Sequence, residues 1–216
     1  MQNKLTLNLN KTNYSNYLLF HPVKEKQSHH FLLNFDGNML MQTNESKYLG
    51  VLDAKLNWKA HILHLTSSVA QSFGVLCKIR HFLSKNLLKM PCNTFIKSKL
   101  SYAITLWASA YKSDLHKLNV LNNLAVCCIT FANRHTNLNT LYKKHKILKL
   151  NELQHYKLGK HMFKLHNKET PLLLIGNYQL VRDRHNYNTR HSPKDNYVIP
   201  LRHRKQDQNS FMYLEH

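Results

Sequence analysis

The hydrophobic and polar positions of the first 56 residues alternate with the period of β-strands. Leu5, Leu7 and Leu9 alternate with polar residues, and a short apolar run covers residues 17–20. Asp36-Gly37 separates the apolar runs FLLNF and NMLM, which favours a tight hairpin because both turn residues must tolerate positive φ. We predict a further strand in KYLGVL, residues 47–52.

From Trp58 onward the apolar residues recur every three or four positions, which is the period of helices. Three stripes are predicted: Ile62, Leu65, Val69, Phe73, Leu76, Ile79 and Leu83; Ile96, Leu100, Ala103 and Trp107; and Leu115, Leu118, Leu121, Ala125 and Cys128. Pro91 falls inside a helical run and is predicted to kink or end it. Shorter helices are predicted over 137–146 and 153–166, and after Tyr178 the pattern fades into an extended basic tail.

These patterns predict an α+β fold, with a small antiparallel β-sheet or hairpin region followed by a mainly helical bundle. Hydrophobic residues make up 43% of the 216 residues, which is enough to form a core. Only five Gly and five Pro are present, which favours long elements over a loop-rich fold.

Charge is the feature of the composition that points to a function. The chain has 31 Lys and Arg against 11 Asp and Glu, a net charge of +20. Between Ala54 and Arg134 there are eleven basic residues and one acid, Asp114, so the excess is not confined to a tail. A folded and evenly basic body attracts a phosphate backbone, because neutralised phosphates release condensed counterions. A solvated surface and an anionic membrane are the alternatives.

The cysteines and the chain's amino-terminal sequence indicate an intracellular protein, nuclear or cytoplasmic. Cys77, Cys92, Cys127 and Cys128 form no CxxC framework and are expected to be small buried side chains in a reducing compartment. Residues 1–14 lack the apolar segment of a signal peptide, and we expect no membrane span because no run of about 18 apolar residues occurs.

Two segments near the amino terminus, with several helical ones, resemble a known family. NKLTLNLNKTNYSNYLLF, residues 3–20, resembles the palm motif that follows the catalytic Asp-Asp pair in reverse transcriptases of LINE-type and jockey-like non-LTR retrotransposons. KYLGVLDAKLNWKAHI, residues 47–62, resembles the primer-grip hairpin of the same family. The segments that resemble its thumb helices and a later motif are SFGVLCKIRHFL, LSYAITLWASAY, LHKLNVLNNLAVCCIT and HNYNTR.

This resemblance covers nearly the whole chain and implies three parts. Residues 1–56 would be the edge of a palm with the primer-grip hairpin, 57–134 a helical thumb, and 135–216 a helical extension with a basic tail. In the family, both catalytic motifs lie upstream of the position where Met1 stands. We therefore expect a fragment of an RNA-directed DNA polymerase that contributes primer or template binding and is inactive alone.

The absence of paired carboxylates supports that expectation. Polymerisation needs two metal ions about 3.5–4 Å apart, held by closely placed carboxylates. The aspartates of this chain are isolated, so no cofactor is expected and Mg²⁺ would require the missing upstream carboxylates; they are Asp36, Asp53, Asp114, Asp183, Asp195 and Asp207.

The resemblance also assigns candidate nucleic-acid contacts in the first part. Lys47, Tyr48 and Gly50 belong to the hairpin that grips the primer end in such polymerases, and Gly50 would allow close approach of backbone to phosphate. This copy is one residue shorter than the family pattern between Val51 and Asp53, and a one-residue slip would turn side chains to the opposite face. Lys11 resembles the palm lysine proposed to assist the leaving pyrophosphate.

In the helical part, basic side chains are predicted on faces opposite a buried core. Phe73, Leu76, Trp107 and Leu121 would be buried against each other. The opposite faces would show Lys59, Lys78, Arg80, Lys85, Lys89, Lys97 and Lys99. Of these, Lys78, Arg80 and Lys85 are the candidate contacts to nucleic acid, tracking a backbone without reading bases; the alternative is that such residues merely keep the bundle soluble.

Metal and thiol chemistry find little support. His61 with His64, and His155 with His161, lack a Cys or carboxylate spaced to complete a zinc site. The expected partners are therefore RNA, DNA or an RNA–DNA hybrid, with no membrane and no small-molecule substrate. Two other hypotheses stay open: a stand-alone helical nucleic-acid-binding module, and a degenerate transposon-derived reading frame that folds poorly.

Overall fold

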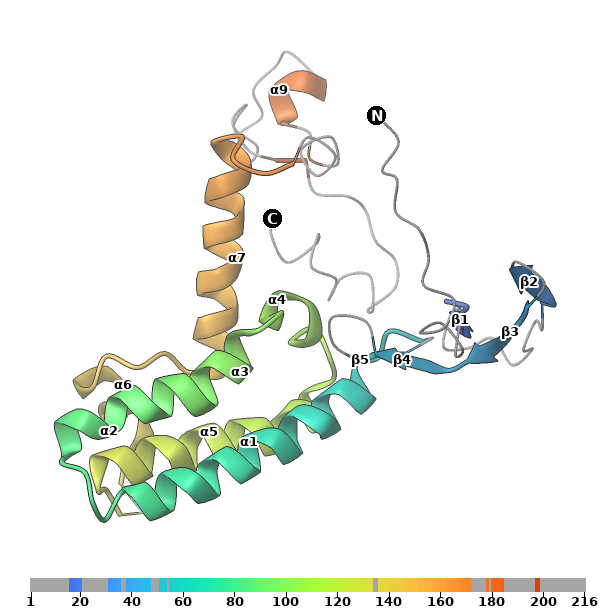
Figure 1. The fold of residues 1–216 in the computed structure, drawn as a ribbon. Helices are drawn as coiled ribbons and strands as arrows, with labels where there is room; N and C mark the ends of the chain where they lie inside the picture. The colour runs from blue at the N-terminus through green and yellow to red at the C-terminus, as the bar shows by residue number, and fades with distance from the viewer. Residues whose placement is uncertain are drawn as a thin grey trace. The chain divides into compact units, whose positions relative to one another are not determined.

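The computed structural model describes residues 16–20, 31–35, 38–47, 51–53, 55–133, 136–171, 178, 180–184 and 197–198. The chain divides into two compact units, residues 1–63 and 64–216, whose helices and strands are labelled in Figure 1. Strands occur in the first unit and helices dominate the second, which confirms the predicted α+β class. The predicted strand around Leu5, Leu7 and Leu9 lies outside the described residues.

The first unit contains a three-stranded sheet built from β1 (Asn16–Leu18), β2 (Leu33–Phe35) and β3 (Asn38–Thr43), in the order β1-β3-β2. The antiparallel pairing of β2 with β3 confirms the two strands predicted on either side of Asp36-Gly37, and the turn itself lies outside the described residues. However, β1 pairs with β3 in parallel, so the sheet is mixed and not purely antiparallel. The long connection between these two strands permits parallel pairing, which a short hairpin would not.

The segment KYLGVL forms parts of two strands, so the predicted single strand is wrong. β4 (Glu45–Lys47) pairs antiparallel with β5 (Val51–Asp53), and Lys47 stands opposite Val51. That pairing requires the chain to reverse within the three residues between them, which excludes one continuous strand.

Helix α1 (Lys59–Ile79) follows the strands and confirms the first predicted stripe. The Asn57 side chain accepts a hydrogen bond of 2.8 Å from the Lys59 backbone N–H, which satisfies one of the free donors at the start of the helix. The stripe residues Ile62, Leu65, Val69 and Leu76 are buried, while Phe73 and Ile79 are half-buried. The helix ends at Ile79, so Leu83 lies beyond it.

By length and composition alone, α1 could cross a membrane, and it is the one such helix in the described part of the chain. Its most apolar 18-residue window has a mean hydropathy of 1.2, and 28% of that window is buried. Core helices of soluble proteins pass the same test, so this is weak evidence. The expectation of no membrane partner therefore stays a prediction.

The helical run around Pro91 neither ends nor breaks there, contrary to the prediction. α2 (Lys85–Cys92) passes without interruption into a π-helical segment, η1 (Asn93–Lys97), and then into α3 (Ser98–Ser101). The wider turn accommodates the proline, which cannot donate a helical hydrogen bond. The hydroxyls of Thr94 and Ser98 donate to the carbonyls of Met90 and Thr94, four residues earlier, which helps to satisfy the altered backbone.

The second predicted stripe is split between two helices. Ala103 has a left-handed φ of 47°, and it separates α3 from the short helix α4 (Ile104–Trp107). Even so, Ile96, Leu100 and Trp107 of the stripe are all fully buried. The Trp107 ring donates its N–H to the Tyr102 carbonyl at 2.8 Å.

The third stripe lies on α5 (Lys112–Thr130), where Leu118, Ala125 and Cys128 are buried. α5 packs against α2, and it meets α1 where the sulfurs of Cys77 and Cys128 lie 3.9 Å apart. Figure 1 shows α1, the α2–α3 run and α5 lying alongside one another. All four cysteines are free thiols.

Two further helices complete the well-described part of the second unit. α6 (Leu138–Lys144) packs on α5, and α7 (Leu150–His166) contacts α3 and α4. Both confirm helices predicted from the sequence, and Leu158 and Leu165 are buried as expected. The tail is not wholly extended, since Val181–Arg184 form a short helix, α9, beside a bridge between Leu180 and Tyr197.

Candidate nucleic-acid interface

The structure brings two of the predicted basic residues together over an aromatic ring at the end of α5. The Arg80 guanidinium lies 4.3 Å from the centre of the Phe131 ring, and the Lys85 ammonium lies 5.3 Å from it. Both distances suit cation–π attraction. We call Arg80, Lys85 and Phe131 the Phe131 patch.

Phe131 holds an uncommon backbone conformation for a bulky residue. It ends α5 with a left-handed φ of 56°, which glycine adopts more readily. Its side chain is nevertheless 39% exposed. Strained, partly exposed aromatic residues often mark functional sites, because burial alone gives no reason to retain them.

The remaining predicted contacts are placed as follows. Lys78 lies in the last turn of α1 and is exposed, as is Lys85. Lys47 is the last residue of β4. Lys11, Tyr48 and Gly50 lie outside the described residues.

Two lysines predicted on the surface point into the helical unit. Lys99 donates to the Ser68 carbonyl at 3.1 Å and to the Ser68 and Ser72 hydroxyls at 2.7 and 2.8 Å, which ties α3 to α1. Lys97 donates to the Asn122 side chain at 2.8 Å and to the Leu148 carbonyl at 2.9 Å. The expectation that both lie on the outer face is therefore wrong, since the π-helical turn shifts the helical register after Pro91.

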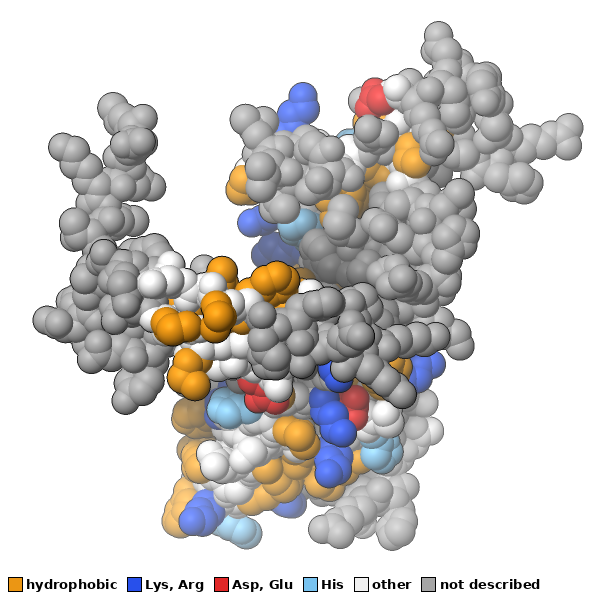
Figure 2. Space-filling view, turned by 90° about the vertical axis from the view of Figure 1, so that its right-hand side faces the viewer, with side chains coloured by type: hydrophobic (Ala, Val, Ile, Leu, Met, Phe, Trp, Pro, Cys, Tyr) orange, Lys and Arg blue, Asp and Glu red, His pale blue; other side chains and the backbone are white. Residues whose placement is uncertain are grey.

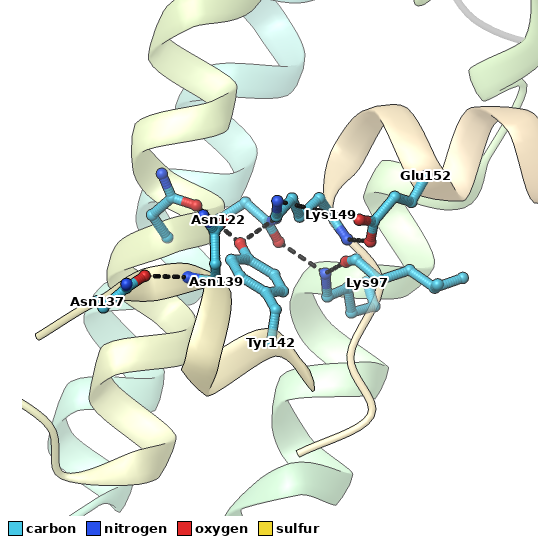
Figure 3. A network of polar contacts seen from close by, with 9 residues as sticks. Lys97, Asn122, Asn137, Asn139, Tyr142, Lys149 and Glu152 are labelled. Carbon is cyan, nitrogen blue, oxygen red and sulfur yellow. Dashed lines mark hydrogen bonds and ion pairs between the residues drawn. The ribbon is translucent and has the colours of Figure 1, made fainter. Parts of the chain in front are cut away.

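Lys97 belongs to a polar network at the junction of η1, α5 and α6, shown in Figure 3. Asn122 is only 1% exposed, and its amide donates to the Tyr142 hydroxyl at 2.8 Å. That hydroxyl in turn donates to Asn123 at 2.7 Å. Buried polar groups need such partners, because an unmet donor or acceptor is expensive inside a protein.

Burial shifts the acid–base properties of this network. It lowers the pKa of Lys97 to about 8, and the nearby Cys92 and Glu152 only partly offset that effect. Burial also raises the pKa of Tyr142 above its usual value, so the hydroxyl stays protonated. Lys97 is thus an internal structural cation and not a free contact for phosphate.

A pocket opens beside this network, between α6 and the start of α7. Its volume is about 490 Å³, and its lining residues are Asn139, Tyr142, Lys143, Lys146, Ile147, Leu148, Lys149 and Glu152. Lys143 and Lys146 are exposed. We call this the junction pocket.

Thiol and metal chemistry remain without support in the described residues. Burial, followed by the neighbouring Cys77, raises the pKa of Cys128 to about 11, the opposite of what a nucleophilic thiol needs. Within the part of the chain that the structure describes, no group of three or more His, Cys, Asp or Glu could hold a metal ion.

The helical unit is strongly basic as a whole. Residues 64–133 and 136–171 contain sixteen Lys and Arg against three acids, a formal excess of +13. Figure 2 shows Lys and Arg side chains scattered over one face among hydrophobic ones, with acidic side chains at few places. A surface of this kind gives a broad attraction for polyanions and no preference for a sequence.

Reasoning from sequence missed two features of these sites. The Phe131 patch depends on the end of α5, where Phe131 follows the last apolar position of the stripe by three residues. The junction pocket depends on Lys143, Lys146 and Lys149, and their density in the run YKKHKILK was a signal that could have been used.

The chain matches no family model, no curated protein and no solved structure.

Proposed function

We propose that the chain binds nucleic acid through the phosphate backbone, as the thumb-like part of a reverse transcriptase would, and that it does not polymerise alone. The observation that carries this proposal is the excess of +13 in the described helical unit, because so uneven a charge balance favours a polyanionic partner. RNA, DNA or an RNA–DNA hybrid would be held without base readout.

The exposed cations near the Phe131 patch give this binding a location. Lys78 and Lys85 extend into solvent, whereas Lys97 and Lys99 are engaged in internal hydrogen bonds. Arg80 keeps its planar guanidinium against an aromatic ring, an arrangement that leaves its edge able to meet phosphate oxygens.

The antiparallel pairing of β4 with β5 supports the retrotransposon version of this proposal. The two strands flank residues 48–50, where the resemblance implies a primer-grip hairpin. In that version Lys11 and Lys47 also contribute to binding.

A test uses the full chain with a fluorescently labelled RNA–DNA hybrid in an anisotropy titration. We expect saturable binding that does not change with the hybrid's sequence, and no primer extension when template, primer and Mg²⁺ are supplied. Absence of binding at micromolar protein would contradict the proposal, and detectable extension would contradict the claim that the chain lacks catalytic carboxylates.

A stand-alone helical binding module is the second candidate, since the helical unit has its own core of fully buried side chains, including Leu76, Trp107 and Leu118. The double variant Lys11→Gln/Lys47→Gln separates the two candidates. A loss of affinity of about fivefold or more, as expected for the removal of backbone contacts, favours the reverse-transcriptase version. Unchanged affinity favours the helical module.

A further inference from the structure

The junction pocket combines a small volume with a strong local excess of positive charge. Three lysines line it, Lys143, Lys146 and Lys149, together with one carboxylate, Glu152. That carboxylate is already engaged: it accepts the Lys149 backbone N–H at 2.9 Å and lies 4.0 Å from the Lys149 ammonium. Glu152 can thus balance one of the three lysines, and two positive charges are left facing a volume of about 490 Å³.

The backbone that carries these lysines is fixed from behind. Lys89 donates to the His145 carbonyl at 3.1 Å, and Lys97 donates to the Leu148 carbonyl at 2.9 Å. The Ile147 backbone N–H donates to the Tyr142 carbonyl at 3.0 Å. Figure 3 shows Lys97, Asn122 and Tyr142 meeting at this junction. A turn held at three carbonyls presents its side chains with little freedom to lose on binding.

We propose that the junction pocket is a binding site for a phosphate group with two or more negative charges, such as the terminal phosphate of a nucleotide or a polyphosphate. Ammonium groups gathered around one small volume repel each other, and a multiply charged anion removes that repulsion. Lysine ammoniums act as point charges toward phosphate, and the oxygens of a terminal phosphate can accept from several of them at once.

This site is separate from the surface proposed to hold a nucleic-acid backbone. Lys78, Arg80 and Lys85 do not line the pocket. Failure of one proposal therefore leaves the other standing.

Lys97 provides a readout from behind the pocket. Burial lowers the pKa of its ammonium to about 8, so part of it is neutral near physiological pH. A bound anion would favour the charged form and raise that pKa. We expect the NMR titration of the Lys97 side chain to shift to higher pH when tripolyphosphate is bound.

The decisive experiment is calorimetric titration of the full chain with sodium tripolyphosphate. The test variant is Lys143→Gln/Lys146→Asn, in which asparagine suits the left-handed φ of 52° at position 146. The matched control is Lys144→Gln/Lys168→Asn, which removes the same charge from two exposed residues outside the pocket, one of them also left-handed at φ 57°.

We expect saturable binding at one site, weakened at least tenfold in the test variant and less than twofold in the control. Absence of saturable binding, or equal weakening in both variants, overturns the proposal. Circular dichroism confirms that each variant is folded, and the Lys97 titration of the wild-type chain gives a second reading that needs no variant.

A second pair of ligands distinguishes the sources of the phosphate. A preference for a 5′-phosphorylated oligonucleotide over its 5′-hydroxyl form, lost in the test variant, assigns the pocket to nucleic-acid ends. Saturable tripolyphosphate binding without that preference assigns it to free polyphosphates or nucleotides.

Discussion

The interior at η1 and α3 and the surface at the end of α1 use the same residue type in opposite ways. Lys97 and Lys99 donate two and three hydrogen bonds to neighbouring helices and loops, and they join these elements. Lys78 and Lys85 are exposed and remain available to a partner. Positive charge alone therefore does not identify a binding surface, because part of it holds the fold together.

The largest effect is expected inside. Replacement of Asn122 with alanine removes the acceptor of the Lys97 ammonium and the donor to Tyr142. A buried charge left without a partner should lower the free energy of unfolding by about 3 kcal/mol. Urea denaturation measures it, with Asn119→Ala, an exposed position one turn earlier on α5, as the control. Equal stability of the two variants would show that the network does not stabilise the fold.

A smaller loss is expected at Lys99. Lys99→Met keeps the length of the side chain but removes three hydrogen bonds to Ser68 and Ser72. Because the site is only partly buried, water can replace some of them, and we expect a loss of about 2 kcal/mol. The exposed Lys112→Met should stay within about 0.5 kcal/mol of the wild type. A loss at Lys112 as large as that at Lys99 would remove the distinction between inner and outer lysines.

On the surface, substitution should affect binding and leave stability unchanged. Lys78→Gln/Lys85→Gln should weaken binding to an RNA–DNA hybrid about tenfold in 0.1 M salt, since two phosphate contacts are lost. It leaves the contact between Arg80 and Phe131 in place. The control Lys112→Gln/Lys117→Gln removes the same charge from exposed positions nearer the start of α5, with Lys117 about 21 Å along the helix from Phe131. An equal effect of both pairs would mean that the cations act only through net charge.

The smallest effect is the pH dependence contributed by Lys97. Its folded pKa of about 8 lies below the ordinary value of 10.5, so the folded state binds fewer protons than the unfolded state between these values. Stability from this group therefore rises with pH through that window, by about 1 kcal/mol between pH 7 and 9. Burial raises the pKa of Cys92, Cys128 and Tyr142, and these groups act in the opposite direction as pH rises through their ordinary values.

The difference between the wild type and Lys97→Met isolates this contribution. Unfolding free energies of both proteins measured from pH 7 to 9 should show the rise in the wild type alone. A rise of the same size in both would assign it to other groups.

Period and turn chemistry predicted most of the elements. The apolar stripe of α1 and the hairpin strands on either side of Asp36-Gly37 follow from local pattern, since burial on one face fixes helical or alternating spacing. The parallel pairing of β1 with β3 does not, because it joins residues far apart in the sequence. The passage through Pro91 by a π-helical turn was also beyond local rules, and it decides where Lys97 and Lys99 point.

The sites were less predictable than the fold. Lys78 and Lys85 lie on the surface as expected, but the role of Phe131 depends on how α5 ends. The junction pocket depends on three elements that meet only after folding, with Lys97 and Asn122 supplied from helices 25 residues apart. Sequence pattern indicates which side chains are basic, and tertiary packing decides which of them are available.

The salt dependence of hybrid binding by the full chain tests the central claim most directly. If phosphate contacts dominate, the logarithm of the association constant should fall with the logarithm of salt concentration at a slope steeper than about −2, and Lys78→Gln/Lys85→Gln should reduce that slope by about 1 to 2. An affinity that stays flat between low and moderate salt would contradict the account.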